Sequence, residues 1–154
     1  MAKKKISANI SFKEATVSET ATKLGIDNTP TEDHLEAMVT VAEKIFQPLR
    51  EWCNHPIRIN SMYRSEALNK ALGGSKTSQH RLGQALDLDS LGSKSNADLF
   101  NWVAENLNFD QLIWEFGNDD PKWIHISYVS DDTNRNQKLK ATNHRGKTRY
   151  SVIK

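Results

Sequence analysis

Residues 78–87 read Ser78-Gln79-His80-Arg81-Leu82-Gly83-Gln84-Ala85-Leu86-Asp87, and this stretch decides how the chain folds. It places a histidine and a carboxylate seven positions apart, with Gly83 between them to allow a sharp turn. From Ala85 onward polar and apolar side chains alternate, which is typical of a strand with one buried face. A turn followed by a strand can bring His80 and Asp87 to one point in space. Imidazole nitrogen and carboxylate oxygen are both good Zn²⁺ ligands, and a catalytic zinc site needs three protein ligands.

The best candidate for a third ligand is His125, in the segment 122–128. This segment also alternates, with Ile124 and Ile126 on one face and His125 on the other. Asp87 and His125 therefore both lie inside predicted strands, where a polar side chain costs free energy unless it is satisfied. Metal coordination would satisfy both of them.

The combined motif resembles the zinc D-Ala-D-Ala carboxypeptidase family. That family includes VanX-type dipeptidases, the L-alanyl-D-glutamate peptidases of phage endolysins and the zinc fold of Hedgehog signalling domains. Residues 61–65, 68–69 and 73–74 also resemble its short single-domain members from bacteria and phages, and the likeness extends over about residues 11–130. The resemblance rests on these residues: Ser78, His80, Gly83, Ala85, Asp87, Trp123 and His125. It implies the Hedgehog/DD-peptidase zinc fold, with Zn²⁺ as the cofactor and a stem peptide of peptidoglycan as the substrate.

Local patterns along the chain predict an α+β fold, with helices packed on one face of a small, largely antiparallel sheet. A capping box at Ser11 starts a short helix, and Thr31 caps the longest one, which Pro48 should kink or break near its end. Further elements are expected as a strand at 56–60, a helix from Ser65 to Leu72, a strand through Asp89, a helix from Ser95 and two strands at 110–116 and 122–129.

Length and composition predict one soluble globular domain. The chain has 154 residues, of which 37% are hydrophobic and 26% charged, and no apolar run approaches the roughly 18 residues that a membrane helix needs. The basic start at residues 1–5 is followed by no apolar segment, so we expect no export signal. This favours the cytoplasm of the producing cell or a phage virion, with action on the cell wall after release. Cys53 is the only cysteine, which excludes an internal disulfide and a cysteine-based zinc site.

We assign residues 1–130 to a zinc peptidase catalytic domain and residues 131–154 to a basic C-terminal extension of the same domain. The extension is open to two interpretations. It can be a solvated, partly flexible tail, or it can attract a polyanion such as an anionic polymer of the cell wall. The net charge of +2 is too small to indicate nucleic-acid binding by the whole chain, and we expect a monomer. The cations in question are Arg135, Lys138, Lys140, Arg145, Lys147 and Arg149.

The general base is where this sequence departs from part of the family. The larger relatives carry an acidic residue three positions before the last histidine ligand, and Lys122 occupies that position here. Glu115 is the replacement that we favour, because strand alternation places it on the polar face and a hairpin would set it directly opposite His125. The alternative is a surface glutamate on the outer face of the hairpin. Asp119 and Asp120 are weaker candidates, since acids in loops are more often turn formers.

Three residues are candidates for holding the substrate. The resemblance assigns Arg64 to a substrate carboxylate or carbonyl, a role that suits a permanently charged, bidentate guanidinium. Ser78 could bind substrate or orient the loop before His80, and Trp123 could line the cleft or belong to the core. The remaining histidines have no motif partner, and we expect them not to be ligands: His34, His55 and His144.

The leading hypothesis is a zinc metallopeptidase that cleaves stem peptides through a metal-activated water. Two activities remain open, D-alanyl-D-alanine carboxypeptidase and endolysin-like L-alanyl-D-glutamate endopeptidase. The alternative is a non-catalytic zinc-binding or cell-wall-binding module of a virion. A nucleic-acid binder that uses the basic segment is a weaker rival, because no aromatic-and-basic surface motif accompanies it.

Overall fold

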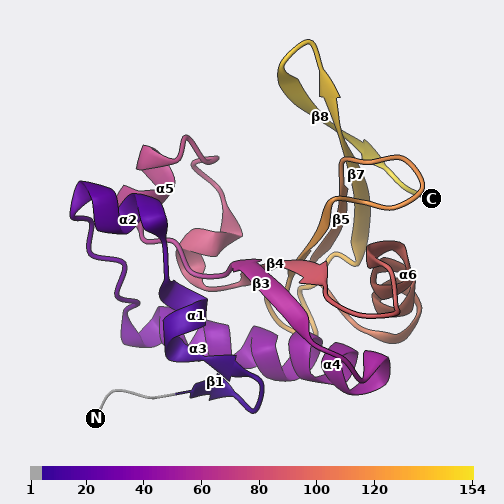
Figure 1. The fold of residues 1–154 in the computed structure, drawn as a ribbon, viewed down its shortest axis with the longest axis horizontal. Coiled ribbons are helices and arrows are strands. Elements are labelled where there is room, and N and C mark those ends of the chain that lie inside the picture. The colour runs from indigo at the N-terminus through magenta and orange to yellow at the C-terminus, as the bar shows by residue number, and fades with distance from the viewer. Residues whose placement is uncertain (1–4) are drawn as a thin grey trace.

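The computed structural model describes residues 5–154 and confirms the α+β fold with a mostly antiparallel sheet (Figure 1). A six-stranded sheet has the order β3-β4-β6-β5-β7-β8, and a two-stranded sheet pairs β1 with β2. The strands are β1 (Lys5–Ser7), β2 (Ile10–Ser11), β3 (Ile57–Ser61), β4 (Ala85–Ser90), β5 (Gln111–Glu115), β6 (Trp123–Ser127), β7 (Gln137–His144) and β8 (Lys147–Val152). The helices are α1 (Phe12–Thr16), α2 (Glu19–Leu24), α3 (Glu32–Val41), α4 (Gln47–Cys53), α5 (Glu66–Ala71) and α6 (Asn96–Asn106), with a π-helical segment at Ala42–Phe46 and a 3₁₀ turn at Gln79–Leu82.

Helix starts follow the capping signals in the sequence. Ser11, Thr31, Ser65 and Ser95 each accept a hydrogen bond from a backbone N–H in the first turn of their helix. Such a cap satisfies a donor that the helix itself leaves without a partner. These four predicted helix starts are confirmed.

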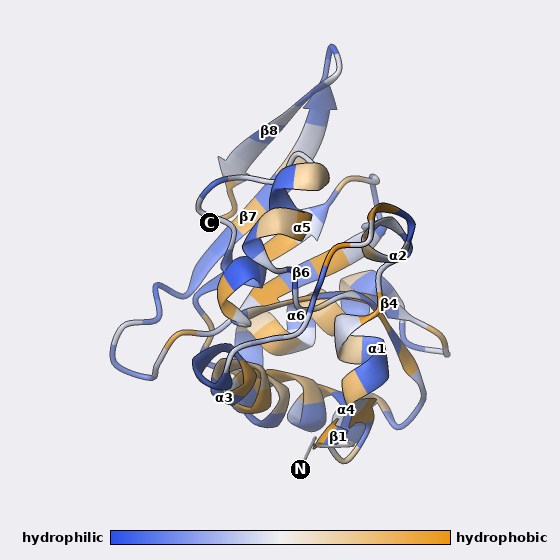
Figure 2. Cartoon of the chain, turned by 90° about the vertical axis from the view of Figure 1, so that its left-hand side faces the viewer, coloured by the Kyte–Doolittle hydropathy of each residue, from blue (hydrophilic) through white to orange (hydrophobic). Residues whose placement is uncertain are grey.

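One face of the sheet carries the main core and the other carries the candidate site. Leu86, Leu88, Ile124 and Ile126 are fully buried against α3, the π-helical segment, α4 and α6. Figure 2 shows hydrophobic stretches of the central strands inside the molecule and more hydrophilic residues toward the tip of the β7–β8 hairpin. Because side chains alternate along a strand, burying this row directs the intervening polar residues of β4 and β6 to the opposite face.

The long helix does not break at Pro48 but changes its hydrogen bonding in the turn before it. Residues 42–46 are π-helical, and Pro48 lies at the start of α4. Proline has no N–H to donate to the carbonyl four residues earlier, and its ring crowds that carbonyl. A widened turn accommodates both effects, so the helical path continues to Cys53, which is buried and unpaired.

The β5–β6 hairpin forms in a register that differs from the predicted one. Glu115 pairs with Trp123, and His125 pairs with Ile113, so Glu115 does not lie directly opposite His125. The predicted direct pairing was wrong. The loop spans residues 117–121, so the residue opposite Glu115 is Trp123, which lies two positions nearer the loop than His125. Glu115 and His125 still share a face, as diagonal neighbours with Cα atoms about 7–8 Å apart.

Strand alternation also fails at Phe116. Alternation along β5 would place its side chain on the same face as Leu112 and Trp114, but it packs with the small cluster of Ile113 on the opposite face. Phe116 has a φ of 61°, which is unusual for a bulky residue and turns its side chain away from the pattern of the strand.

The basic C-terminal segment is not a loose tail. β7 pairs in parallel with β5, and β8 pairs antiparallel with β7, so the segment adds two strands to the sheet (Figure 1). Apolar contacts hold β7 in place, since Leu139 and Ala141 are buried against Ile113. The ordered β7–β8 hairpin replaces the flexible tail that low apolar content suggested.

Charge is segregated between the two faces of the β7–β8 hairpin. The face shared with Ala141 and Tyr150 carries no charged residue, whereas the strand cations all lie on the other face. Those cations are Lys138, Lys140, Lys147 and Arg149. Attraction of this outer face to a polyanion stays a prediction.

The first four residues of the basic start lie outside the described part of the chain. The expectation that this start is not part of an export signal therefore stays a prediction. Within residues 5–154, no helix combines the length and the apolar character that crossing a membrane requires.

Candidate active site

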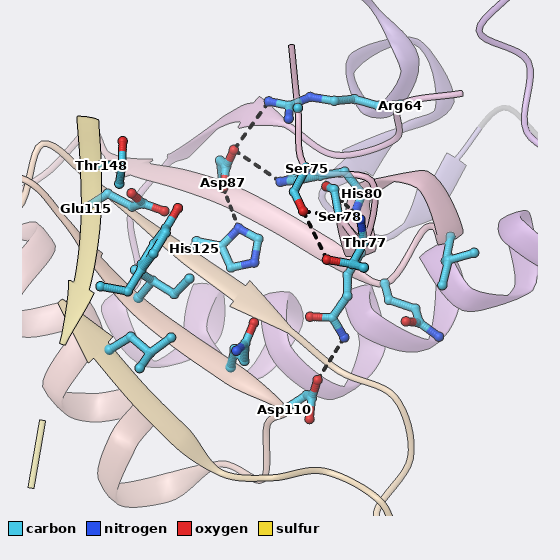
Figure 3. Close-up of a pocket in the computed structure, with 18 of the residues that line it drawn as sticks. Arg64, Ser75, Thr77, Ser78, His80, Asp87, Asp110, Glu115, His125 and Thr148 are labelled. Carbon is cyan, nitrogen blue, oxygen red and sulfur yellow. Dashed lines mark hydrogen bonds and ion pairs between the residues drawn. The ribbon is translucent and has the colours of Figure 1, made fainter. Parts of the chain in front are cut away.

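His80, Asp87 and His125 converge on the open face of the sheet (Figure 3). Each offers one ligand atom, and these atoms lie within 4.8 Å of one another. Asp87 lies between the histidines, with Oδ2 at 3.2 Å from His80 Nε2 and Oδ1 at 2.9 Å from His125 Nδ1. The structure therefore brings together the three residues that the sequence motif indicated.

Strand pairing and one turn create this convergence. Asp87 on β4 is the direct partner of His125 on β6, so their side chains leave the sheet side by side. His80 comes from the 3₁₀ turn, and Ser78, the N-cap residue just before this turn, accepts a hydrogen bond from the His80 N–H. Gly83 then turns the chain into β4 with a φ of 74°, and a Cβ there would collide with the backbone carbonyl of His34. Gly83 is thus required by its backbone conformation and by its packing.

The hydrogen bonds of His80 show that the group fits a cation. His80 is 3% exposed, and its Nδ1 lies 2.7 Å from the carbonyl oxygen of Met62. A carbonyl only accepts, so Nδ1 donates this hydrogen bond and Nε2 faces the Asp87 carboxylate. At 3.2 Å, Nε2 and the carboxylate oxygen can share a cation, either a proton on the imidazole or a metal ion. Two imidazole nitrogens and a carboxylate oxygen are a donor set that Zn²⁺ accepts.

The electrostatics of Asp87 support the same conclusion. Burial would raise the pKa of this carboxyl group, but the imidazoles of His80 and His125 outweigh it and hold the pKa well below its ordinary value. Asp87 is therefore ionised over the whole physiological range of pH. An ionised carboxylate is the form that binds a metal.

Glu115 lies on the same face, inside an apolar surround. Its nearest neighbours on the strands are Ile113, Trp123 and Ala141, and Glu115 itself is only 8% exposed. Burial raises its pKa to about 7, with His125 opposing and Asp87 adding to the shift. A carboxyl group with a pKa near neutrality can exchange a proton at working pH. The structure excludes the alternative of a surface glutamate on the outer face.

Arg64 is held at the edge of the group by backbone contacts on both of its sides. Asn28 donates to the carbonyl of Tyr63 and accepts from the N–H of Ser65, and the N–H of Arg64 donates to the carbonyl of His80. The guanidinium Nη2 lies 3.8 Å from Asp87 Oδ2, and the side chain keeps 24% of its surface exposed. The backbone at Arg64 is thus held in place, and its side chain remains accessible to a ligand.

A cleft of about 1070 Å³ surrounds these groups. Ser78 and Trp123 both line it, although Ser78 also caps the 3₁₀ turn and Trp123 packs edge to face against Phe116. Pockets for small ligands usually measure about 300–1,000 Å³, so the cleft can hold a peptide of several residues.

The remaining histidines and Asp120 are not among the residues that line the cleft. His34 bonds the Tyr63 hydroxyl, His55 lies 2.9 Å from the carbonyl oxygen of Pro56, and His144 is at the exposed end of β7. Asp120 accepts a hydrogen bond from the first turn of α6, as expected for a loop acid with a structural role.

Sequence patterns missed a buried network beside the cleft. Asp110 is 2% exposed and accepts hydrogen bonds from the Arg135 guanidinium, the Arg135 backbone N–H and Gln79. Gln79 directly precedes His80, so the network ties the loop that carries this histidine to the start of β5. The three residues lie 25 or more positions apart, and no short motif joins them.

Asp110→Ala is expected to lower the free energy of unfolding by about 2–3 kcal/mol, because it removes a charged acceptor from several donors at once. The hydrogen bonds of Arg135 hold the pKa of Asp110 below its ordinary value, so this contribution is present at neutral pH and is lost as the pH falls. Urea unfolding at neutral pH measures the change. Asp132→Ala, which removes an exposed acid nearby, is the control, and equal stability of both variants would contradict the prediction.

Comparison with known families agrees with this geometry. Residues 8–127 match the family described as Peptidase M15, a span that covers most of the chain and all of the proposed ligands. No curated protein matches the chain significantly. The matched span, together with a His–Asp–His group that suits zinc, shows that this chain belongs to the peptidase M15 family, whose members are zinc-dependent metallopeptidases that act on peptidoglycan.

Proposed function

We propose that this protein hydrolyses a peptide bond in the stem peptide of peptidoglycan, as a D-alanyl-D-alanine carboxypeptidase or an L-alanyl-D-glutamate endopeptidase. The observation that carries the proposal is the group of His80, Asp87 and His125 in an open cleft, with the buried carboxyl of Glu115 on the same face. A purely structural zinc site is closed by four protein ligands, whereas a catalytic one keeps a position open.

His80, Asp87 and His125 would hold the zinc. When bound, zinc lowers the pKa of water and polarises a carbonyl group. The carbonyl of Met62 fixes the tautomer and orientation of His80, which is the usual role of a second hydrogen-bond partner of a ligating histidine.

Glu115 acts as the general base and then as the general acid. Its carboxylate takes a proton from the attacking water and later delivers it to the nitrogen of the leaving amine, so the peptide C–N bond breaks without releasing an unstable amide anion. The apolar side chains around Glu115 raise its pKa and make both steps possible near neutral pH. A nearby dication would lower that pKa again, which favours the basic form before reaction.

Arg64 binds a carboxylate or carbonyl oxygen of the substrate. The guanidinium is held at 3.8 Å from Asp87 and remains partly exposed, so it can form hydrogen bonds to a ligand without moving far. Its permanent charge suits the free carboxylates that stem peptides carry.

Arg64→Ala is expected to reduce kcat/KM by about 10- to 100-fold while zinc remains bound, since a charge-assisted hydrogen bond contributes about 1.5–3 kcal/mol. Arg64→Lys should restore only part of the loss, because an ammonium group cannot make two parallel hydrogen bonds. Steady-state kinetics and metal analysis of both variants provide the measurement. Unchanged catalytic efficiency in Arg64→Ala would show that this arginine does not bind the substrate.

Mass spectrometry of muropeptides digested with the zinc-loaded protein tests the function directly. Loss of a terminal alanine indicates the carboxypeptidase, and separation of the stem peptide after its first residue indicates the endopeptidase. Intact muropeptides after prolonged digestion would favour the alternative, a non-catalytic zinc-binding or cell-wall-binding module.

We also infer that residues 131–154 belong to the same folded domain as residues 1–130. The parallel pairing of β7 with β5, next to Glu115, supports this inference.

A further inference from the structure

The β7–β8 hairpin reaches the cleft although it lies outside the residues that match the family. Leu139, Thr148 and Tyr150 all line the cleft, beyond the matched span of 8–127. Figure 3 shows Thr148 of β8 and Glu115 at the same end of the pocket, and both line it. A segment that the family match does not cover therefore forms one wall of the site.

Strand register places Tyr150 in line with Glu115. Trp123 pairs with Glu115, Glu115 with Ala141, and Ala141 with Tyr150, so one row crosses β6, β5, β7 and β8. Directly paired residues share a face, and two strands span about 10 Å. The side chain between them is only the methyl group of Ala141, so the long Tyr150 ring can extend over it toward Glu115.

The side chain of Tyr150 is available to bind a ligand. It lines the cleft and is 57% exposed, so its ring is accessible to a ligand. Its hydroxyl has no hydrogen-bond partner within residues 5–154. A tyrosine supplies a large, rigid surface and one polar group at low cost in conformational entropy.

The two ends of the cleft differ in charge. Arg64 follows β3, at one edge of the sheet, and the hairpin ends in β8, at the other edge. The hairpin residues that line the cleft are Leu139, Thr148 and Tyr150, none of which is charged. An anionic group of the substrate therefore fits the end near Arg64, and an uncharged, hydrogen-bonding portion fits the hairpin end.

We propose that Tyr150 is a substrate-positioning residue, whose hydroxyl donates a hydrogen bond to an uncharged peptide carbonyl on the opposite side of the scissile bond from the group held by Arg64. The substrate is then an extended peptide that crosses the whole cleft. This inference rests on the proposed peptidase function and adds the part of the substrate that the hairpin recognises.

The test compares two variants that each remove a single hydroxyl from β8, Tyr150→Phe and Ser151→Ala. Their side chains lie on opposite faces of the strand, so only the first alters the cleft. With the zinc-loaded enzyme and a stem peptide that the wild type cleaves, Tyr150→Phe should raise KM about 2- to 10-fold, as expected for one lost hydrogen bond, with a smaller change in kcat. Ser151→Ala should match the wild type, and zinc content and Tm should be unchanged in both.

A shortened peptide separates positioning from a structural role. If the peptide keeps only one residue beyond the scissile bond on the hairpin side, the wild type and Tyr150→Phe should cleave it equally, because neither can bind the missing portion. With the full peptide, Tyr150→Ala should raise KM more than Tyr150→Phe does. With the shortened peptide, the two variants should not differ. An unchanged KM in Tyr150→Phe, or an equal loss on both peptides, would overturn the proposal. A wild type that cleaves no stem peptide would instead refute the proposed function, and the inference would fall with it.

Discussion

Glu115→Gln is expected to fold and bind zinc normally, yet to cleave stem peptides at least about 100-fold more slowly than the wild type. The amide keeps the size of the carboxylate and removes its basicity, so only proton transfer is lost. Glu115 is suited to that transfer because it is buried beside Ile113 and Trp123, which raises its pKa to about 7. Single-turnover kinetics on a defined stem peptide, with metal content measured in parallel, provide the test.

The same substitution should have a pH-dependent effect on the zinc-free protein. The folded-state pKa of Glu115 is raised above the ordinary value of 4.5, so its ionisation destabilises the folded state as the pH rises. Glu115→Gln should therefore increase Tm by several degrees at pH 8 and change it little at pH 4. Thermal unfolding of both proteins after removal of metal measures this difference independently of activity.

Substitutions of the two acids in the loop 117–121 test whether Glu115, and not Asp119 or Asp120, is the general base. Asp119→Asn should retain activity, because that side chain is not among the residues that line the cleft. Asp120→Asn should affect the first turn of α6, which Asp120 caps, more than catalysis. Near-normal turnover in Glu115→Gln, combined with inactive Asp119→Asn or Asp120→Asn, would show that the base lies in the loop.

His125→Ala is expected to abolish stable metal binding and, with it, activity. Purified wild-type protein should contain about one zinc per chain, and the variant should lose it on dialysis, because two remaining ligands cannot replace a three-ligand site. Removing His125 also takes away one of the two imidazoles that stabilise the Asp87 carboxylate. Elemental analysis of the dialysed proteins provides the measurement.

His144→Ala is the matched control for this prediction, since His144 lies at the exposed end of β7 and takes no part in the group. It should retain zinc and activity. We expect His125→Ala to remain largely folded, because the core around Met38, Ile45 and Leu49 packs independently of the site. Full zinc retention in a folded His125→Ala would contradict the ligand assignment.

Most of the fold and the three proposed ligands could be predicted from local sequence patterns. Helix caps at Ser11 and Thr31 depend on hydrogen bonds that span three residues, so they can be recognised without knowledge of distant contacts. Alternation in β4 and β6 predicted which side chains face the core, because burial of one strand face constrains every second residue. His125 and Asp87 emerged from that alternation as polar residues of the opposite face.

Relations between distant segments could be decided only by the tertiary structure. The pairing of Glu115 with Trp123 depends on how the loop 117–121 closes, and a shift of two positions preserves the face, so alternation alone cannot detect it. The parallel pairing of β7 with β5 joins two segments that no tight turn connects. Because β8 pairs with β7, this arrangement also brings Tyr150 to the cleft.

The sequence by itself therefore determined the capped helix starts and the buried faces of β4 and β6, because each depends on near neighbours in the chain. It also indicated three residues suited to zinc, but it did not predict β7 and β8. The tertiary structure decided the register beside Glu115, the network of Asp110 and the role of the C-terminal hairpin as a wall of the cleft. These features arise when segments far apart in the sequence bury apolar surface and satisfy hydrogen bonds together, and no local pattern encodes which segments will meet.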